Sequence, residues 1–119
     1  MQRLLLISGL LFFFASCSKD KFDYSQCPTV DSMQVSYAAD IKSIVNENCV
    51  TCHYSNSTLD STMTYDFSNY DGLKRAIGSV YNRIIRPVED PLHMPAGAEL
   101  SDCDLLKLKI WIQNGAPEN

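Results

Sequence analysis

Cys49-Val50-Thr51-Cys52-His53 is the stretch of this 119-residue sequence that decides its fold. Its two thiols are separated by about one helical turn, and the imidazole of His53 follows the second thiol directly. Thiols at this spacing can add to the two vinyl groups of a haem, which places the imidazole beneath the ring, where it can bind the iron. Because C-x-x-C-H is typical of haem attachment, we predict one covalent haem c per chain, held by Cys49, Cys52 and His53.

Two other kinds of site also use a C-x-x-C pair. A thiol-redox pair usually follows a strand in a βαβ unit, and no such unit is visible in the sequence. A zinc site needs a second close pair of ligands, whereas the remaining cysteines, Cys17, Cys27 and Cys103, are far apart. We therefore favour haem over both, and keep as an alternative a haem-free protein with a disulfide at this motif.

The first 16 residues are typical of an export signal rather than of the fold. Arg3 gives a positive start, and the apolar run over residues 4–15 is too short to span a bilayer. Phe14-Ala15-Ser16-Cys17 resembles a bacterial lipobox. That resemblance implies that Cys17 is lipidated and anchors the protein to a membrane, facing the periplasm or at the cell surface. Ordinary secretory cleavage after Ala15 would instead leave Cys17 free.

The remaining cysteines are expected to form a disulfide, because an exported protein folds in an oxidising compartment. Cys17 is assigned to lipid, and Cys49 and Cys52 are assigned to haem, which leaves Cys27 and Cys103 as a pair. Closing so long a loop would stabilise the protein by roughly 4–5 kcal/mol in the chain-entropy model. The alternative is two unrelated free thiols.

Composition predicts one small acidic domain. The chain has 10 basic and 14 acidic residues and a net charge of −4, and loss of Arg3 with the signal makes it more negative. This balance argues against binding to nucleic acid. We predict a signal peptide over residues 1–16, a polar tether over 17–34 and a folded domain over 35–119. A mature chain this short buries only a modest core, which a haem would enlarge.

Apolar spacing predicts an all-α domain with long loops between its helices. A first helix over residues 36–48, capped by Ser36, leads into the haem motif. A polar loop follows over 54–69, then a short helix over 71–77 ended by Gly78, and a further helical turn or two over 79–85. The last helix begins with Ser101 as N-cap and ends before Gly115.

The segment over residues 87–97, here called the strap, contains three prolines and must be extended or turning. It carries adjacent candidate iron ligands, His93 and Met94, and adjacent residues of an extended strap point opposite ways. We favour Met94 as the distal ligand, with His93 at the partly exposed rim, although Met94 could instead fill the core. Met63, in the polar loop, is the next sulfur donor.

Arginine is the expected partner for the haem propionates, because its guanidinium binds carboxylates with two parallel hydrogen bonds. Arg83 is the favoured candidate, ahead of Arg75 and Arg86, although each of the three could simply be a solvated charge.

Three motifs together resemble a known family. The motif at residues 49–53, Met94-Pro95-Ala96-Gly97 and the closing Trp111-Ile112-Gln113-Asn114-Gly115-Ala116 are similar to those of small monohaem cytochrome c domains of class I, as found in Bacteroidota and Planctomycetes. The resemblance covers roughly residues 35–119. It implies an all-α fold wrapped around haem c, with His53 and Met94 as axial ligands.

Electron transfer to or from an unidentified redox partner protein is the function that this resemblance implies. The sequence shows no constellation typical of general acid–base or nucleophilic catalysis, so we do not expect an enzyme. One alternative is a peroxidase-like haem enzyme or ligand sensor in which Met94 leaves the iron. The other is a haem-free lipoprotein that binds partners.

Overall fold

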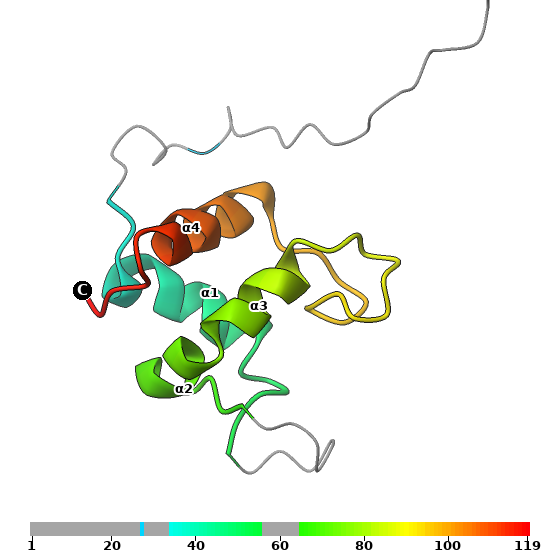
Figure 1. Ribbon diagram of the computed structural model, residues 1–119, viewed down its shortest axis with the longest axis horizontal. Helices are drawn as coiled ribbons and strands as arrows, with labels where there is room; N and C mark the ends of the chain where they lie inside the picture. Colours follow the sequence, from blue (N-terminus) through cyan, green and yellow to red (C-terminus); the bar gives the residue numbers. More distant parts are fainter. Residues whose placement is uncertain (1–26, 28–33, 56–64) are drawn as a thin grey trace, which may run out of the picture.

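The structure is a computed structural model that describes residues 27, 34–55 and 65–119 (Figure 1). Its elements follow in the order η3 (Tyr37–Ile41), α1 (Lys42–Asn48), α2 (Tyr70–Arg75), α3 (Ile77–Ile84) and α4 (Asp102–Gln113). No strand occurs among these residues, so the prediction of an all-α fold is confirmed for them. Within the same residues, none of the helices has the length and hydropathy needed to span a bilayer.

The first helical segment begins where the sequence predicts it. The Ser36 hydroxyl accepts a hydrogen bond from the Ala39 N–H at 3.0 Å, and the Asp40 carboxylate accepts one from the Ser36 N–H at 3.1 Å. These two bonds satisfy amide groups that a helix start would otherwise leave unpaired. The first segment, η3, is π-helical and continues directly into the α-helix α1. The single helix that the sequence predicts therefore consists of a π-helical segment followed by an α-helical one.

The middle of the chain departs from the prediction in one respect. The break between α2 and α3 lies at Ala76, which is 2% exposed, and Gly78 lies inside α3 with open space around it. The prediction that Gly78 ends a helix is therefore wrong. The chain turns at Ala76 because a small buried residue there lets Leu73 and Ile84 from the two helices reach the same core.

Helix α4 is the centre of the core. It begins at the predicted N-cap, where the Ser101 hydroxyl accepts a hydrogen bond from the Asp104 N–H at 3.1 Å. Both η3 and α3 pack against it, as Figure 1 shows. Trp111 of α4 is fully buried, stacks on Tyr37 with ring centroids 5.9 Å apart, and donates its indole N–H to the Pro117 carbonyl at 2.9 Å. Trp111 therefore has a structural role.

The residues after α4 connect the helices. Gly115 and Ala116 have φ angles of 86° and 48°, which turn the chain back over the core. The Ala116 carbonyl accepts hydrogen bonds from the Tyr70 hydroxyl and the Lys74 ammonium, both at 2.9 Å. Asn119 then accepts the Ala38 N–H through its backbone oxygen and the Tyr37 N–H through its side chain. The closing motif thus joins η3, α2 and α4.

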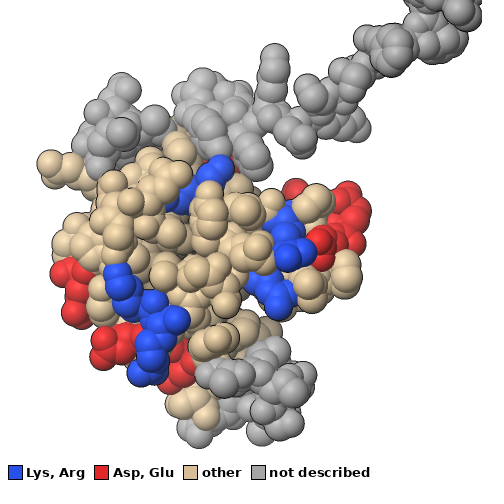
Figure 2. All heavy atoms as spheres, in the orientation of Figure 1, with Lys and Arg blue, Asp and Glu red and all other residues tan. Residues whose placement is uncertain are grey.

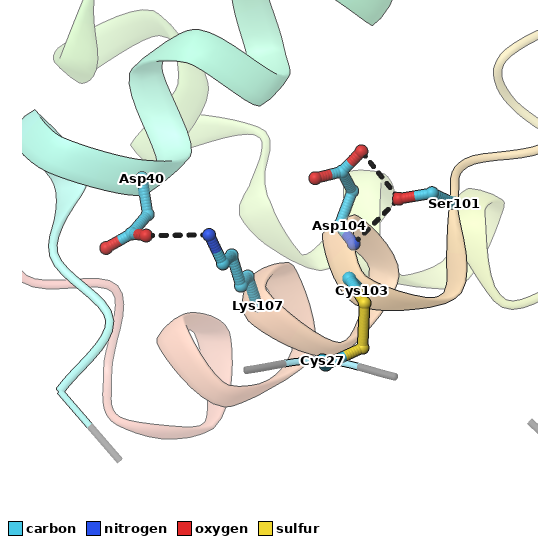
Figure 3. The surroundings of a disulfide bond; sticks show 6 residues. All are labelled: Cys27, Asp40, Ser101, Cys103, Asp104 and Lys107. Atoms are coloured by element: carbon cyan, nitrogen blue, oxygen red, sulfur yellow. Dashed lines mark hydrogen bonds and ion pairs between the residues drawn. A yellow bond between two sulfur atoms is a disulfide. The ribbon is translucent and has the colours of Figure 1, made fainter. Parts of the chain in front are cut away.

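A disulfide fastens the N-terminal part of the chain to α4 (Figure 3). The sulfur atoms of Cys27 and Cys103 are 1.96 Å apart, and their Cα atoms are 5.4 Å apart. This is the pairing that the cysteine count predicts. One turn further along α4, the Lys107 ammonium pairs with the Asp40 carboxylate of η3 at 2.9 Å.

Candidate functional site

The motif at residues 49–53 forms a tight turn that continues the end of α1. Cys49 is the C-cap of α1, and its carbonyl accepts the N–H groups of Cys52 at 3.1 Å and His53 at 2.9 Å. Both cysteines are free thiols, with Cys49 half-buried and Cys52 exposed. Burial raises the pKa of the Cys49 thiol to about 11, whereas a redox-active cysteine has a lowered pKa. The thiol-redox interpretation is therefore disfavoured.

The imidazole of His53 is held by a ring contact rather than by hydrogen bonds at Nδ1. It stacks on the buried ring of Phe67, with centroids 4.6 Å apart and planes 26° apart, and the Phe67 N–H donates to the His53 carbonyl at 2.9 Å. The Nδ1 atom is buried and has no hydrogen-bond partner. A histidine buried only for structure normally has its ring nitrogens paired, so this imidazole is available as a ligand.

Phe67 owes its position to a close approach between two backbone segments. A Cβ atom on Gly72 would lie 1.7 Å from the Asp66 carbonyl oxygen, so only glycine lets the loop come this close to α2. The Asn69 side chain caps α2 by accepting the Gly72 N–H at 2.9 Å and fixes the same corner. Sequence reasoning missed both Phe67 and Gly72. A glycine inside a short helix is the one signal that could have pointed to this contact.

The strap is a series of turns fastened to the end of α3. The Met94 N–H donates to the Arg83 carbonyl at 3.3 Å, and the Arg83 guanidinium donates to the Leu92 carbonyl at 3.2 Å. Within this region Asp90 accepts the Leu92 N–H at 2.8 Å and pairs with Arg86 at 2.8 Å, and these contacts lower the pKa of its carboxyl group. Arg83 therefore helps to hold the strap, and its proposed contact with a propionate stays a prediction.

His93 does not lie at an exposed rim, contrary to the prediction. It is 7% exposed, and its ring nitrogens Nδ1 and Nε2 lie 2.7 Å from the Arg86 carbonyl oxygen and 2.9 Å from the Ala98 carbonyl oxygen. The prediction assumed an extended strap, and turns bring this side chain inward instead. With both nitrogens at carbonyl oxygens, His93 is a poor iron ligand, and half-buried Met94 is the better candidate on the strap.

Several exposed apolar side chains lie close in the sequence to the candidate ligands. In the described part of the chain, the exposed large apolar residues are Tyr54, Tyr65, Ile85, Val88 and Leu92. Tyr54 follows His53 directly, and Leu92 comes two residues before Met94. Thiols, an imidazole and a thioether are the groups that hold a haem c, and Cys49, Cys52, His53 and Met94 supply them.

Two of the predicted site residues cannot be compared with the structure, because Cys17 and Met63 lie outside the described residues. No group of three or more His, Cys, Asp or Glu side chains that could hold a metal ion directly occurs among residues 27, 34–55 and 65–119. Comparison of the chain with protein-family models, curated proteins and solved structures finds no match.

Proposed function

We propose that this protein is a monohaem c-type cytochrome that transfers single electrons. The observation that carries the proposal is the turn at the end of α1, which presents two unbonded thiols and an imidazole with a buried, unpartnered nitrogen within one pentapeptide. Cys49 and Cys52 would form the thioether bonds, and His53 and Met94 would be the axial ligands. The resemblance to small cytochrome c domains supports the same assignment.

The chain's own residues would set the properties of the site. When bound, the haem supplies an iron that cycles between Fe(II) and Fe(III). Phe67 fixes the plane of the His53 ring, and the contacts between the strap and α3 fix the backbone of Met94. A thioether ligand favours the ferrous state and so raises the reduction potential. The exposed apolar side chains near both ligands would cover the ring and exclude water.

We also propose the cellular setting. Lipidation at Cys17 would anchor the domain to a membrane after export, facing the periplasm or at the cell surface. The disulfide between Cys27 and Cys103 is compatible with an oxidising compartment. The partner would be another redox protein, and the acidic net charge of −4 favours a partner with a basic docking face.

The experiment that tests the proposal asks whether haem is covalently attached. The full chain is expressed together with a haem-attachment machinery, denatured and extracted with acidified organic solvent. We expect the haem absorption to stay with the polypeptide. The double variant Cys49→Ala/Cys52→Ala should lose it, whereas the matched control Cys27→Ala/Cys103→Ala should keep it. Haem that extracts freely from the unmodified protein would show that the proposal is wrong.

A second experiment separates an electron carrier from a haem enzyme or sensor. If Met94 is a permanent ligand, the resting ferrous protein should bind carbon monoxide poorly. Met94→Ala should then bind it readily, lose the sulfur-to-iron charge-transfer absorption and have a lower reduction potential. Rapid carbon monoxide binding by the unmodified protein would instead favour the enzyme or sensor.

A further inference from the structure

The imidazole of His93 connects the two ends of the strap. Arg86 is the residue immediately before the strap, and Ala98 is the residue immediately after it. The Nδ1 atom of His93 lies 2.7 Å from the Arg86 carbonyl oxygen, and the Nε2 atom lies 2.9 Å from the Ala98 carbonyl oxygen. One side chain from the middle of the strap therefore closes the strap into a ring. We infer that His93 is a positioning residue for Met94, an inference that rests on the proposed function.

The burial of His93 makes these contacts consequential. The side chain is 7% exposed, so its ring nitrogens depend for partners on these two carbonyl oxygens rather than on water. A carbonyl oxygen only accepts, so each contact is a hydrogen bond when its ring nitrogen carries the proton. Loss of the ring removes its contacts with the Arg86 and Ala98 carbonyls and so releases both ends of the strap.

Met94 is coupled to this ring through the backbone. It follows His93 directly, and its own N–H donates to the Arg83 carbonyl at 3.3 Å. The His93 N–H donates to the Asp90 carbonyl at 2.8 Å. The peptide groups on both sides of His93 are thus tied to α3 or to the strap, and the imidazole ties the strap's two ends. Met94 would then be presented by a preorganised segment rather than by a loose loop.

The test uses the haem-loaded protein and three variants. His93→Ala removes both ring contacts, and His93→Gln retains one donor-bearing nitrogen. Trp111→Phe is the matched control, since it removes one ring N–H bond whose partner, the Pro117 carbonyl, is not part of the strap. Hydrogen exchange of the Met94 amide reports on the strap itself. The rate of carbon monoxide binding to the ferrous protein reports on departure of the Met94 sulfur.

We expect His93→Ala to raise both rates by roughly 5- to 10-fold, from the loss of the hydrogen bond that the ring donates within the strap. His93→Gln should give a smaller increase, and it serves as the test variant if His93→Ala does not fold. Trp111→Phe should lower stability without raising either rate. Unchanged rates in both His93 variants would overturn the inference. Absence of covalent haem from the unmodified protein would overturn the proposed function separately, and Met94 amide exchange would still decide the role of His93.

Discussion

Replacement of Gly72 by alanine should destabilise the protein, because the added methyl group has no room. Its Cβ would lie 1.7 Å from the Asp66 carbonyl oxygen and 2.9 Å from the Asp66 carbonyl carbon. Ordinary van der Waals contact begins at 3.4 Å, and both obstacles are backbone atoms that cannot rotate away. The loop must therefore move away from α2 by more than an ångström, carrying the neighbouring Phe67 with it.

The size of the effect follows from two opposing contributions. Overpacking of a well-packed site costs about 1–3 kcal/mol. Alanine in place of glycine inside a helix stabilises the folded state by about 0.5–1 kcal/mol. We therefore expect Gly72→Ala to lower the free energy of unfolding by about 1–2 kcal/mol, which lowers Tm by roughly 5–15 °C for a domain of this size.

Gly78→Ala is the matched control for this change. Gly78 also lies inside a helix, α3, but a Cβ added there meets no atom within 4 Å. We expect it to stabilise the protein by about 0.5–1 kcal/mol, since only the helix preference of alanine remains. Thermal unfolding of both variants, followed by circular dichroism, measures the difference. Equal Tm values for Gly72→Ala and Gly78→Ala would refute the account of the loop.

Three further changes test other parts of the fold. Burial raises the pKa of the Asp40 carboxyl, but hydrogen bonds from Lys107 and from the Ser36 N–H outweigh this and lower the pKa overall. The ion pair between Asp40 and Lys107 should therefore stabilise the protein above about pH 4, and this stabilisation should be lost as the pH falls further. Lys107→Met should lower the free energy of unfolding by about 0.5–1 kcal/mol at pH 7 and by less at pH 3, as measured by urea unfolding. An equal loss at both pH values would contradict the ion-pair explanation. Peptide mapping without reduction should recover Cys27 linked to Cys103, and recovery of both as free alkylatable thiols would exclude the bond. Reduction of the bond should lower the free energy of unfolding by roughly 4–5 kcal/mol. Trp111→Phe leaves the Pro117 carbonyl unpaired and should cost about 1–2 kcal/mol in denaturant unfolding, so unchanged stability would show that this bond is unimportant.

Local signals account for the parts of the fold that the sequence predicts well. Ser36 and Ser101 both precede apolar periodic stretches, and both cap helices in the structure. The boundaries of α4 follow from its N-cap and from Gly115 after its end. The pairing of Cys27 with Cys103 follows from the other roles assigned to the remaining cysteines. Each of these inferences depends on short spacing or simple counting.

Contacts between distant segments account for what the sequence does not reveal. Nothing local indicates that Ala76, rather than Gly78, separates α2 from α3, because the break depends on which residues reach the core. The stacking of Phe67 on His53 joins two segments on either side of a polar loop. The burial of His93 depends on turns that bring the Arg86 and Ala98 carbonyls to one ring. Such contacts become visible only when the chain is folded.

The disulfide between Cys27 and Cys103 would also determine the length of chain between the domain and the lipid proposed at Cys17. For a chain lipidated at Cys17, roughly ten residues separate the lipid from the first covalent attachment on α4, a reach of at most about 35 Å. Without the bond, the free segment would extend to the start of the folded domain and span up to about 60 Å. Because effective concentration falls with roughly the 3/2 power of linker length, the bond would raise the domain's local concentration at a membrane-bound partner about twofold. Under the proposed function, electron delivery along the membrane would therefore respond to reduction of this disulfide as well as to the state of the haem.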